Sequence, residues 1–105
     1  MLENLSEKEN LILEGLKTVI DPEVEINIVF LGLIYGIDHD QAKNETKIIA
    51  TLSARGCPVG DTILNHIKIA AEAALPGSTA DVELVWEPQW TPDMISEEGK
   101  AALNM

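Results

Sequence analysis

Apolar residues recur near the start of the chain with the spacing of one helix face, and charged residues lie off this face. The apolar stripe consists of Ile12, Leu16, Val19 and Ile20. Ser6 and Glu9 have the S-x-x-E spacing of a capping box, which satisfies free backbone donors at a helix start. Pro22 disfavours helical geometry at the residue before it. The pattern therefore predicts a helix from about residue 7 to about residue 20.

Two apolar runs follow, separated by a polar stretch. The segment Ile26–Ile37 is apolar on both parities, which predicts a strand covered on both faces. Residues 38–45 are polar and typical of turns, and Thr46–Leu52 is apolar again. These segments predict a β-hairpin whose loop spans residues 38–45.

The second half of the chain predicts a helix, a strand and a short helix. Pro58 suits the first position of a helix that ends before Pro76. Apolar residues then alternate with polar ones from Val82 to Trp86, which indicates a third strand. Residues 91–93 can begin a final helix reaching about residue 103.

The predicted order is helix, strand, strand, helix, strand, short helix. This order predicts an α/β (α+β) two-layer sandwich, with a small mixed sheet and both long helices on one face. A crossover through the second helix makes the third strand parallel to the second. Because the first strand is apolar on both parities, we expect the C-terminal segment or another subunit to cover the other face. Residues 1–105 are predicted to form one domain.

Charge and cysteine content narrow the possible partners and the compartment. Seven Lys and Arg against 18 Asp and Glu give a net charge of −11, which disfavours binding to nucleic acid and to anionic membranes. The longest apolar run is too short to span a bilayer, and the N-terminus lacks the pattern of a signal peptide. A single cysteine excludes an intramolecular disulfide and fits a reducing compartment. We therefore expect a cytoplasmic location, with no nucleic acid and no membrane as partner.

Cys57 is the first candidate for chemistry, because it is predicted at the N-cap of the second helix. Free backbone N–H groups and the positive helix end favour a thiolate there. Arg55 adds positive charge, and Gly56 leaves the sulfur approachable. A buried, inert thiol is an equally weighted alternative. One thiol cannot hold an iron-sulfur cluster alone, but it can supply one ligand of a shared, labile site, and a homodimer would offer two.

Other candidates are weaker when taken alone. Asp21 and Glu23 could orient a ligand or act as acid and base, although Asp-Pro-Glu is also an ordinary stop and turn. Neither His39 nor His66 is placed by sequence as a base for Cys57. Alternating acids around His39 resemble a metal cluster, but such residues in a hairpin loop are more often turn formers.

Both tryptophans lie in one proline-containing segment near the C-terminus. Trp86 ends the third strand and is predicted to pack in the core. Trp90 and Met94 are the candidates for contact with a partner protein, and Trp90 is favoured because exposed tryptophans anchor interfaces well. Covering the core and covering a partner are equally weighted uses of this segment.

Four ordered motifs run through most of the chain: Asp21-Pro22-Glu23, residues 27–35, Gly56-Cys57-Pro58 and residues 86–91. Together they resemble the metal-sulfur cluster assembly family, which includes PaaD-like and SufT-like proteins and a subunit of the eukaryotic cytosolic iron-sulfur targeting complex. The resemblance implies a fold like the C-terminal domain of NifU scaffolds and a frequent dimer. It also implies a role in maturing iron-sulfur proteins that is not turnover of a small substrate.

The resemblance also implies a site made of Asp21, Glu23, Ser53 and Cys57. Ser53 stands where threonine is usual in the family, which keeps the hydroxyl group. Phe30 stands where the family usually carries an acid, so any ligand or partner role of that acid would be lost here.

We therefore expect an accessory factor in iron-sulfur cluster assembly or targeting, in which Cys57 transiently ligates iron or a labile iron-sulfur cluster. Its expected partners are the assembly machinery or client apo-proteins, with a homodimer as the expected oligomer. Two alternatives stay open: a thiol-dependent enzyme using Cys57 with Asp21 and Glu23, and a protein-protein adaptor in which Cys57 is inert. In the adaptor, residues 86–94 would dock the client.

Overall fold

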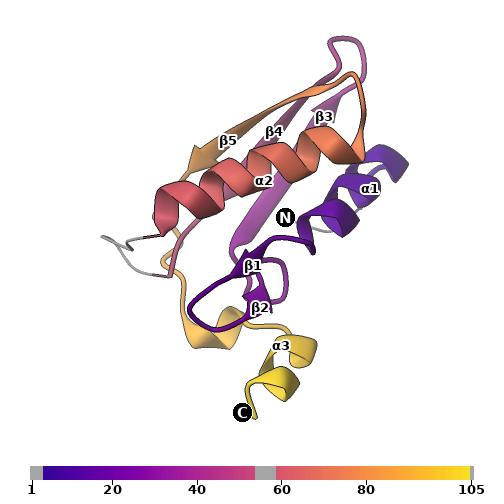
Figure 1. The fold of residues 1–105 in the computed structure, drawn as a ribbon. Helices are drawn as coiled ribbons and strands as arrows, with labels where there is room; N and C mark the ends of the chain where they lie inside the picture. The colour runs from indigo at the N-terminus through magenta and orange to yellow at the C-terminus, as the bar shows by residue number, and fades with distance from the viewer. Residues whose placement is uncertain (1–3, 54–58, 105) are drawn as a thin grey trace.

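A small mixed sheet and two helices form the body of the protein (Figure 1). The computed structural model describes residues 4–53 and 59–104. The sheet has the order β3–β4–β5, with β3 antiparallel to β4 and β4 parallel to β5. The strands are β3 (Ile34–Asp40), β4 (Glu45–Ala50) and β5 (Thr79–Leu84), and the helices on the sheet are α1 (Glu7–Leu16) and α2 (Gly60–Ala74). The predicted two-layer α/β class and the parallel third strand are confirmed.

The capping box at the start of α1 is confirmed, but the helix is shorter than predicted. Ser6 Oγ accepts the Glu9 N–H (3.2 Å), and Glu9 Oε1 accepts the Ser6 N–H (2.9 Å). After Leu16 the chain continues in turns in which each backbone N–H donates to the carbonyl three residues earlier. The last of these bonds runs from the Val19 N–H to the Leu16 carbonyl (3.1 Å). The predicted end at residue 20 is wrong because Ile20 pairs with Asn27 in a small hairpin of β1 (Ile20–Asp21) and β2 (Ile26–Asn27).

The single strand predicted over residues 26–37 is also wrong, because turns separate β2 from β3. Asn27 accepts two of the turn bonds, from Phe30 N–H at its Oδ1 (2.8 Å) and from Leu31 N–H at its carbonyl (3.1 Å). Gly32 then adopts a φ of 80°, which L side chains rarely adopt. Apolar side chains on both parities are thus explained by a buried turn segment rather than by a strand covered on both faces.

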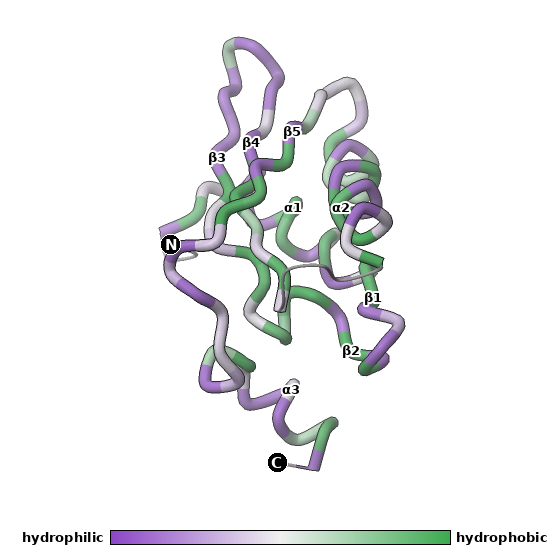
Figure 2. The backbone as a smooth tube through the Cα atoms, turned by 90° about the vertical axis from the view of Figure 1, so that its left-hand side faces the viewer, coloured by the Kyte–Doolittle hydropathy of each residue, from purple (hydrophilic) through white to green (hydrophobic). Residues whose placement is uncertain are grey.

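The β3–β4 loop is shorter than predicted, so β3 runs to Asp40 and β4 begins at Glu45. Asp40 Oδ1 accepts the N–H groups of Ala42 (3.0 Å) and Lys43 (3.3 Å), which fixes the turn. The hydrophilic tip projects beyond the sheet (Figure 2). As a result, the acids on either side of His39 lie on a strand and not in a loop.

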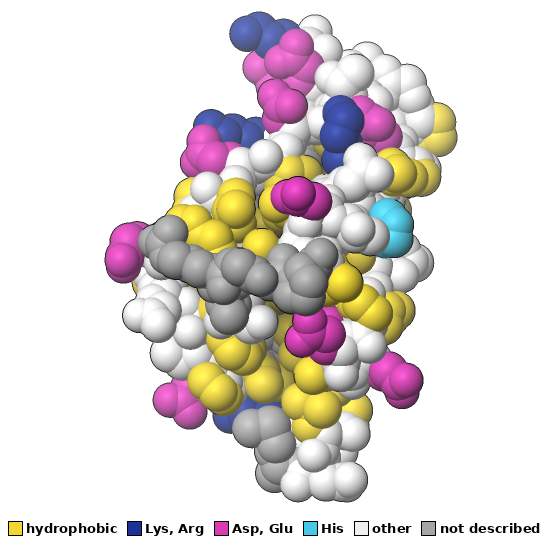
Figure 3. Space-filling model, turned by 60° about the vertical axis from the view of Figure 1, so that its left-hand side comes forward, with side chains coloured by type: hydrophobic (Ala, Val, Ile, Leu, Met, Phe, Trp, Pro, Cys, Tyr) yellow, Lys and Arg dark blue, Asp and Glu magenta, His cyan; other side chains and the backbone are white. Residues whose placement is uncertain are grey.

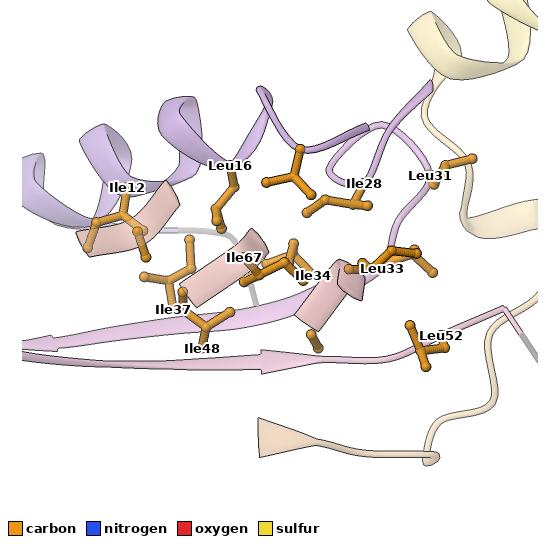
Figure 4. Packing of buried hydrophobic residues seen from close by; sticks show 14 of the residues in the cluster. Ile12, Leu16, Ile28, Leu31, Leu33, Ile34, Ile37, Ile48, Leu52 and Ile67 are labelled. Atoms are coloured by element: carbon orange, nitrogen blue, oxygen red, sulfur yellow. The ribbon is translucent and has the colours of Figure 1, made fainter. Parts of the chain in front are cut away.

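The core lies between the helices and one face of the sheet (Figure 4). Its fully buried large side chains include Ile12, Leu16, Ile48 and Ile67. On the opposite face, exposed Lys47 pairs with Glu83 (3.0 Å), so that part of the sheet is polar and needs no cover. The C-terminal segment or another subunit was expected to cover this second face of the sheet, because residues 26–37 were assigned to one strand. The expectation is wrong for the part of the face that carries Lys47 and Glu83. In the described chain, 4–53 and 59–104, no helix has the length and apolarity to cross a membrane.

Residues 86–104, here called the C-terminal strap, cross the lower end of the sheet in Figure 1. They contain a 3-10 turn, η1 (Pro92–Met94), and a short helix, α3 (Glu97–Ala102), where one final helix was predicted. The strap is bound to the body by hydrogen bonds from the Ser96 N–H to the Phe30 carbonyl (2.8 Å) and from Tyr35 Oη to the Pro88 carbonyl (2.7 Å). The strap therefore holds the turn segment between β2 and β3.

Candidate functional site

A pocket of about 100 Å³ brings together residues from four separated segments of the chain. Three of the residues predicted for the site line it: Asp21, Glu23 and Ser53. The remaining described lining residues are apolar: Val24, Leu31, Leu33, Trp90, Ile95 and Leu103. Glu23 and Ser53, which are far apart in the sequence, therefore lie at the same pocket.

The β1–β2 turn positions the two carboxylates in different surroundings. Asp21 is 7% exposed, and its Oδ1 accepts the Glu23 N–H (2.8 Å). The Asp21 carbonyl accepts the Glu25 N–H (2.8 Å), and Glu25 takes a φ of 61° to complete the turn. Glu23 itself is exposed. One acid is therefore held inside the pocket by its own turn, and the other stands at the mouth.

Ser53 lies at the end of the segment that leaves β4. This segment is anchored by the Thr51 N–H, which donates to the Leu33 carbonyl (2.8 Å). Ser53 is exposed at the pocket and precedes Cys57 by four residues in the sequence. Cys57 lies outside the described residues, together with Arg55 and Gly56, and the predictions on the thiol stay predictions.

Helix α2 begins at Gly60, with Val59 in the N-cap position. This start is two residues later than the predicted start at Pro58, which itself lies outside the described residues. The predicted N-cap position of Cys57 does not agree with this helix start. The expectation of a thiolate at Cys57 therefore has no support from a helix N-cap.

Trp90 and Met94, predicted to contact a partner, make contacts within the chain. Trp90 Nε1 donates to the Leu31 carbonyl (2.7 Å), which fixes the indole ring as one wall of the pocket. Met94 Sδ lies 3.4 Å from Tyr35 Oη. Burial, and secondly the negative charge of Glu87, raise the pKa of Tyr35, so this hydroxyl keeps its proton at neutral pH. Partner contact by Trp90 or Met94 stays a prediction.

Metal binding around His39 is not supported. The ring Nδ1 of His39 lies 2.8 Å from Thr46 Oγ1, and the flanking Asp38 and Asp40 are exposed. Side chains alternate between the two faces of a strand, so these acids point away from the histidine. Asp38 and Asp40 line a separate cavity of about 390 Å³. Within residues 4–53 and 59–104, no group of three or more His, Cys, Asp or Glu side chains is arranged to hold a metal ion.

Comparison with known proteins identifies the family. The family model for iron-sulfur cluster assembly protein matches residues 9–84. The Fe-S protein maturation auxiliary factor YitW of Bacillus subtilis (strain 168) is 39% identical over 98 residues, which cover 93% of this chain and 94% of that protein. This chain belongs to the iron-sulfur cluster assembly protein family.

Further relatives agree with this membership in the family. The Fe-S protein maturation auxiliary factor SufT of Staphylococcus aureus (strain USA300) is 38% identical over 87 residues, covering 83% of this chain and 98% of its own. The crystal structure of a domain of unknown function, DUF59, from Bacillus anthracis matches with a TM-score of 0.87 and 33% identity. That match covers 93% of this chain and 92% of the other. The family and the fold are therefore both established.

The pocket's apolar walls were missed by sequence reasoning. Leu31 and Leu33 were assigned to a strand, and Ile95 and Leu103 were not singled out. Val24 carried the one available signal, because an apolar residue in a short turn is unusual. Phe30 is not among the described lining residues of this pocket.

Proposed function

We propose that this chain is an accessory factor in the maturation of iron-sulfur proteins, which binds iron or a labile cluster transiently and passes it on. The cargo ligands would be the Cys57 thiolate and the carboxylates of Asp21 and Glu23, with Ser53 beside them. The observation that carries this proposal is the shared pocket of Asp21, Glu23 and Ser53, next in sequence to the segment that holds Cys57.

The proposed thiolate and carboxylate ligands suit the transfer of iron or of a cluster better than its storage. Carboxylate oxygen and thiolate sulfur both bind iron, but one thiol leaves a cluster short of its usual four ligands. A client protein, or the second copy in the proposed homodimer, would supply the missing thiols. The pocket, of about 100 Å³, is walled mostly by apolar side chains, which suits neither an ion nor a cluster in its interior. We therefore place the cargo at the mouth, beside the exposed Glu23.

The test compares cargo binding by matched single variants of the whole chain. Under anaerobic conditions, the wild type, Cys57→Ser, Asp21→Asn and Asp81→Asn are each titrated with iron(II), or incubated with iron and sulfide. Asp21→Asn keeps the oxygen that accepts the Glu23 N–H, so the turn survives while the charge is lost. Asp81 lies in the separate cavity on the sheet and serves as a charge-matched control.

We expect Cys57→Ser to abolish cluster absorbance and Asp21→Asn to weaken iron binding about tenfold, a loss of about 1.4 kcal/mol. Asp81→Asn should bind as the wild type does. Equal binding by all four proteins would overturn the ligand assignment. If the variants still supported maturation of a client enzyme, the adaptor alternative would replace the carrier.

A further inference from the structure

The apolar walls of the pocket are not explained by iron binding. Among the described lining residues, Leu31, Leu33 and Ile95 are buried, and only Glu23, Val24 and Ser53 are exposed at the mouth. An ion and its water shell need polar walls, whereas an apolar cavity of about 100 Å³ is better filled by an apolar group. This volume matches one aliphatic side chain.

We propose that the pocket receives an aliphatic side chain of a partner protein, from a segment that carries lysine or arginine beside it. The inference deepens the proposed function and rests on it for the partner's role as a client or assembly protein. Binding would place the partner segment next to the carboxylates and to Ser53, where cargo would be passed on.

The pocket is already formed to receive such a side chain. Trp90 is fixed by its hydrogen bond to the Leu31 carbonyl (2.7 Å), so that wall needs no ordering when a ligand enters. Val24 is 40% exposed at the tip of the β1–β2 turn, where polar residues are usual. Its apolar surface continues the pocket outward. An entering side chain would therefore bury Val24 together with the inner walls.

The negative charge around the pocket favours basic residues of the partner beside the inserted side chain. Asp21 and Glu23 line the pocket, Glu25 is exposed on the same turn, and the described lining holds no Lys or Arg. Most of the visible Lys and Arg side chains in Figure 3 lie at the other end of the molecule. With a net charge of −11, the chain attracts basic segments and repels acidic ones.

The test is an NMR titration of the full chain with the peptide acetyl-Lys-Leu-Lys-amide. We expect the indole N–H signal of Trp90 to shift in a saturable way, with shifts of the Leu103 and Val24 methyl signals. Acetyl-Lys-Ser-Lys-amide, without the aliphatic side chain, and acetyl-Glu-Leu-Glu-amide, with reversed charge, should each bind about tenfold more weakly or not at all.

Two substitutions at similarly exposed apolar positions provide the matched variants. Val24→Phe fills the mouth and should abolish the Trp90 shift, whereas Leu84→Phe, 37% exposed on β5 before substitution, should leave binding unchanged. Amide spectra confirm that both variants are folded. Equal binding of the three peptides, or full binding by Val24→Phe, would overturn the proposal. A Trp90 shift that depends on protein concentration alone would assign the pocket to a second copy and also overturn it.

Cys57→Ser separates this inference from the cargo proposal. Peptide binding should persist in Cys57→Ser, because this substitution leaves every described lining residue of the pocket unchanged. Peptide binding without iron binding would support this inference and would contradict the proposed cargo ligands. Iron binding with no peptide binding would overturn this inference and leave the proposed cargo ligands standing.

Discussion

At the scale of the residue, Gly32 shows how closely the strap approaches the turn segment. Its φ is 80°, and an added Cβ would lie 2.3 Å from the Met94 carbonyl oxygen. Gly32→Ala combines left-handed strain of about 1–2 kcal/mol with displacement of the Met94 backbone. We predict that it lowers the free energy of unfolding by about 2–4 kcal/mol. Urea denaturation followed by tryptophan fluorescence measures the change.

Gly77 provides the matched control for Gly32. Its φ is 90°, but nothing lies within 4 Å of a Cβ added there. Gly77→Ala should therefore lower the free energy of unfolding only by the cost of the backbone strain, about 1–2 kcal/mol. If both substitutions destabilise the protein equally, the close approach of the strap to Gly32 contributes nothing to stability.

Glu9 links the helix cap to the edge of the sheet. Its carboxylate accepts the Ser6 N–H (2.9 Å) and the His39 N–H (2.9 Å). These bonds, that of Ser6 first, hold the pKa of Glu9 below its ordinary value of 4.5. A lowered folded-state pKa adds stability that is present above the unfolded-state pKa and is lost as pH falls through the folded-state pKa.

We therefore predict that Glu9→Gln flattens the acid limb of the stability profile. Its free energy of unfolding at neutral pH should fall by about 1 kcal/mol, and less should be lost on acidification from about pH 7 to about pH 3 than in the wild type. The control is Glu14→Gln, because Glu14 forms only an exposed pair with Lys17 (2.6 Å), of a kind that contributes little. Parallel profiles for the wild type and Glu9→Gln would contradict the assignment.

At the scale of the element, the strap is held to the body by hydrogen bonds such as that from Trp90 Nε1 to the Leu31 carbonyl (2.7 Å). Trp90→Phe keeps an aromatic ring as the pocket wall but removes the donor to the Leu31 carbonyl. Since such a bond contributes about 1 kcal/mol, the Ser96 amide, which donates to the Phe30 carbonyl, should exchange with solvent about five times faster. Hydrogen exchange read by NMR measures this rate.

The reference for that exchange experiment is the Thr51 amide, which donates to the Leu33 carbonyl in the body. It should exchange at the wild-type rate in Trp90→Phe, because the strap can open without the sheet. If both amides exchange faster by the same factor, the strap and the sheet open together and the strap is no separate unit.

Local signals predicted elements well where one short pattern decides the structure. The capping box at Ser6 is visible in the sequence because its partners are three residues apart. The break between β2 and β3 was missed because the apolar side chains of 28–33 are buried in either conformation. The turn is formed by local bonds to Asn27, and it is also held by a contact distant in sequence, from Trp90 Nε1 to the Leu31 carbonyl.

The residues of the candidate site also divide into those that a sequence motif indicates and those that only long-range packing brings together. Asp21, Glu23 and Ser53 were grouped through the family resemblance, and the pocket now contains all three. No local pattern indicated that Leu103 would line the same pocket, since its place depends on how α3, inside the strap, packs against the body. Residues of a site that are fixed by long-range packing leave little trace in the sequence.

At the scale of the whole molecule, the net charge of −11 opposes compactness. The radius of gyration is 13.2 Å, so most like charges lie within about 30 Å of one another, the Debye length at about 0.01 M salt. The described ion pairs, such as Lys47 with Glu83, are exposed and offset little of the repulsion. At about 0.1 M salt the Debye length falls to about 10 Å, which is shorter than most separations in the molecule.

We predict that raising sodium chloride from about 0.01 M to about 0.1 M increases Tm by about 2–5 °C, since about 1 kcal/mol shifts Tm by about 4–8 °C in a domain of this size. Circular dichroism during heating measures this shift. Choline chloride at the same ionic strength should act equally, because screening does not depend on the cation. A rise with sodium alone would indicate specific ion binding, and a fall in Tm would show that the surface ion pairs outweigh the repulsion.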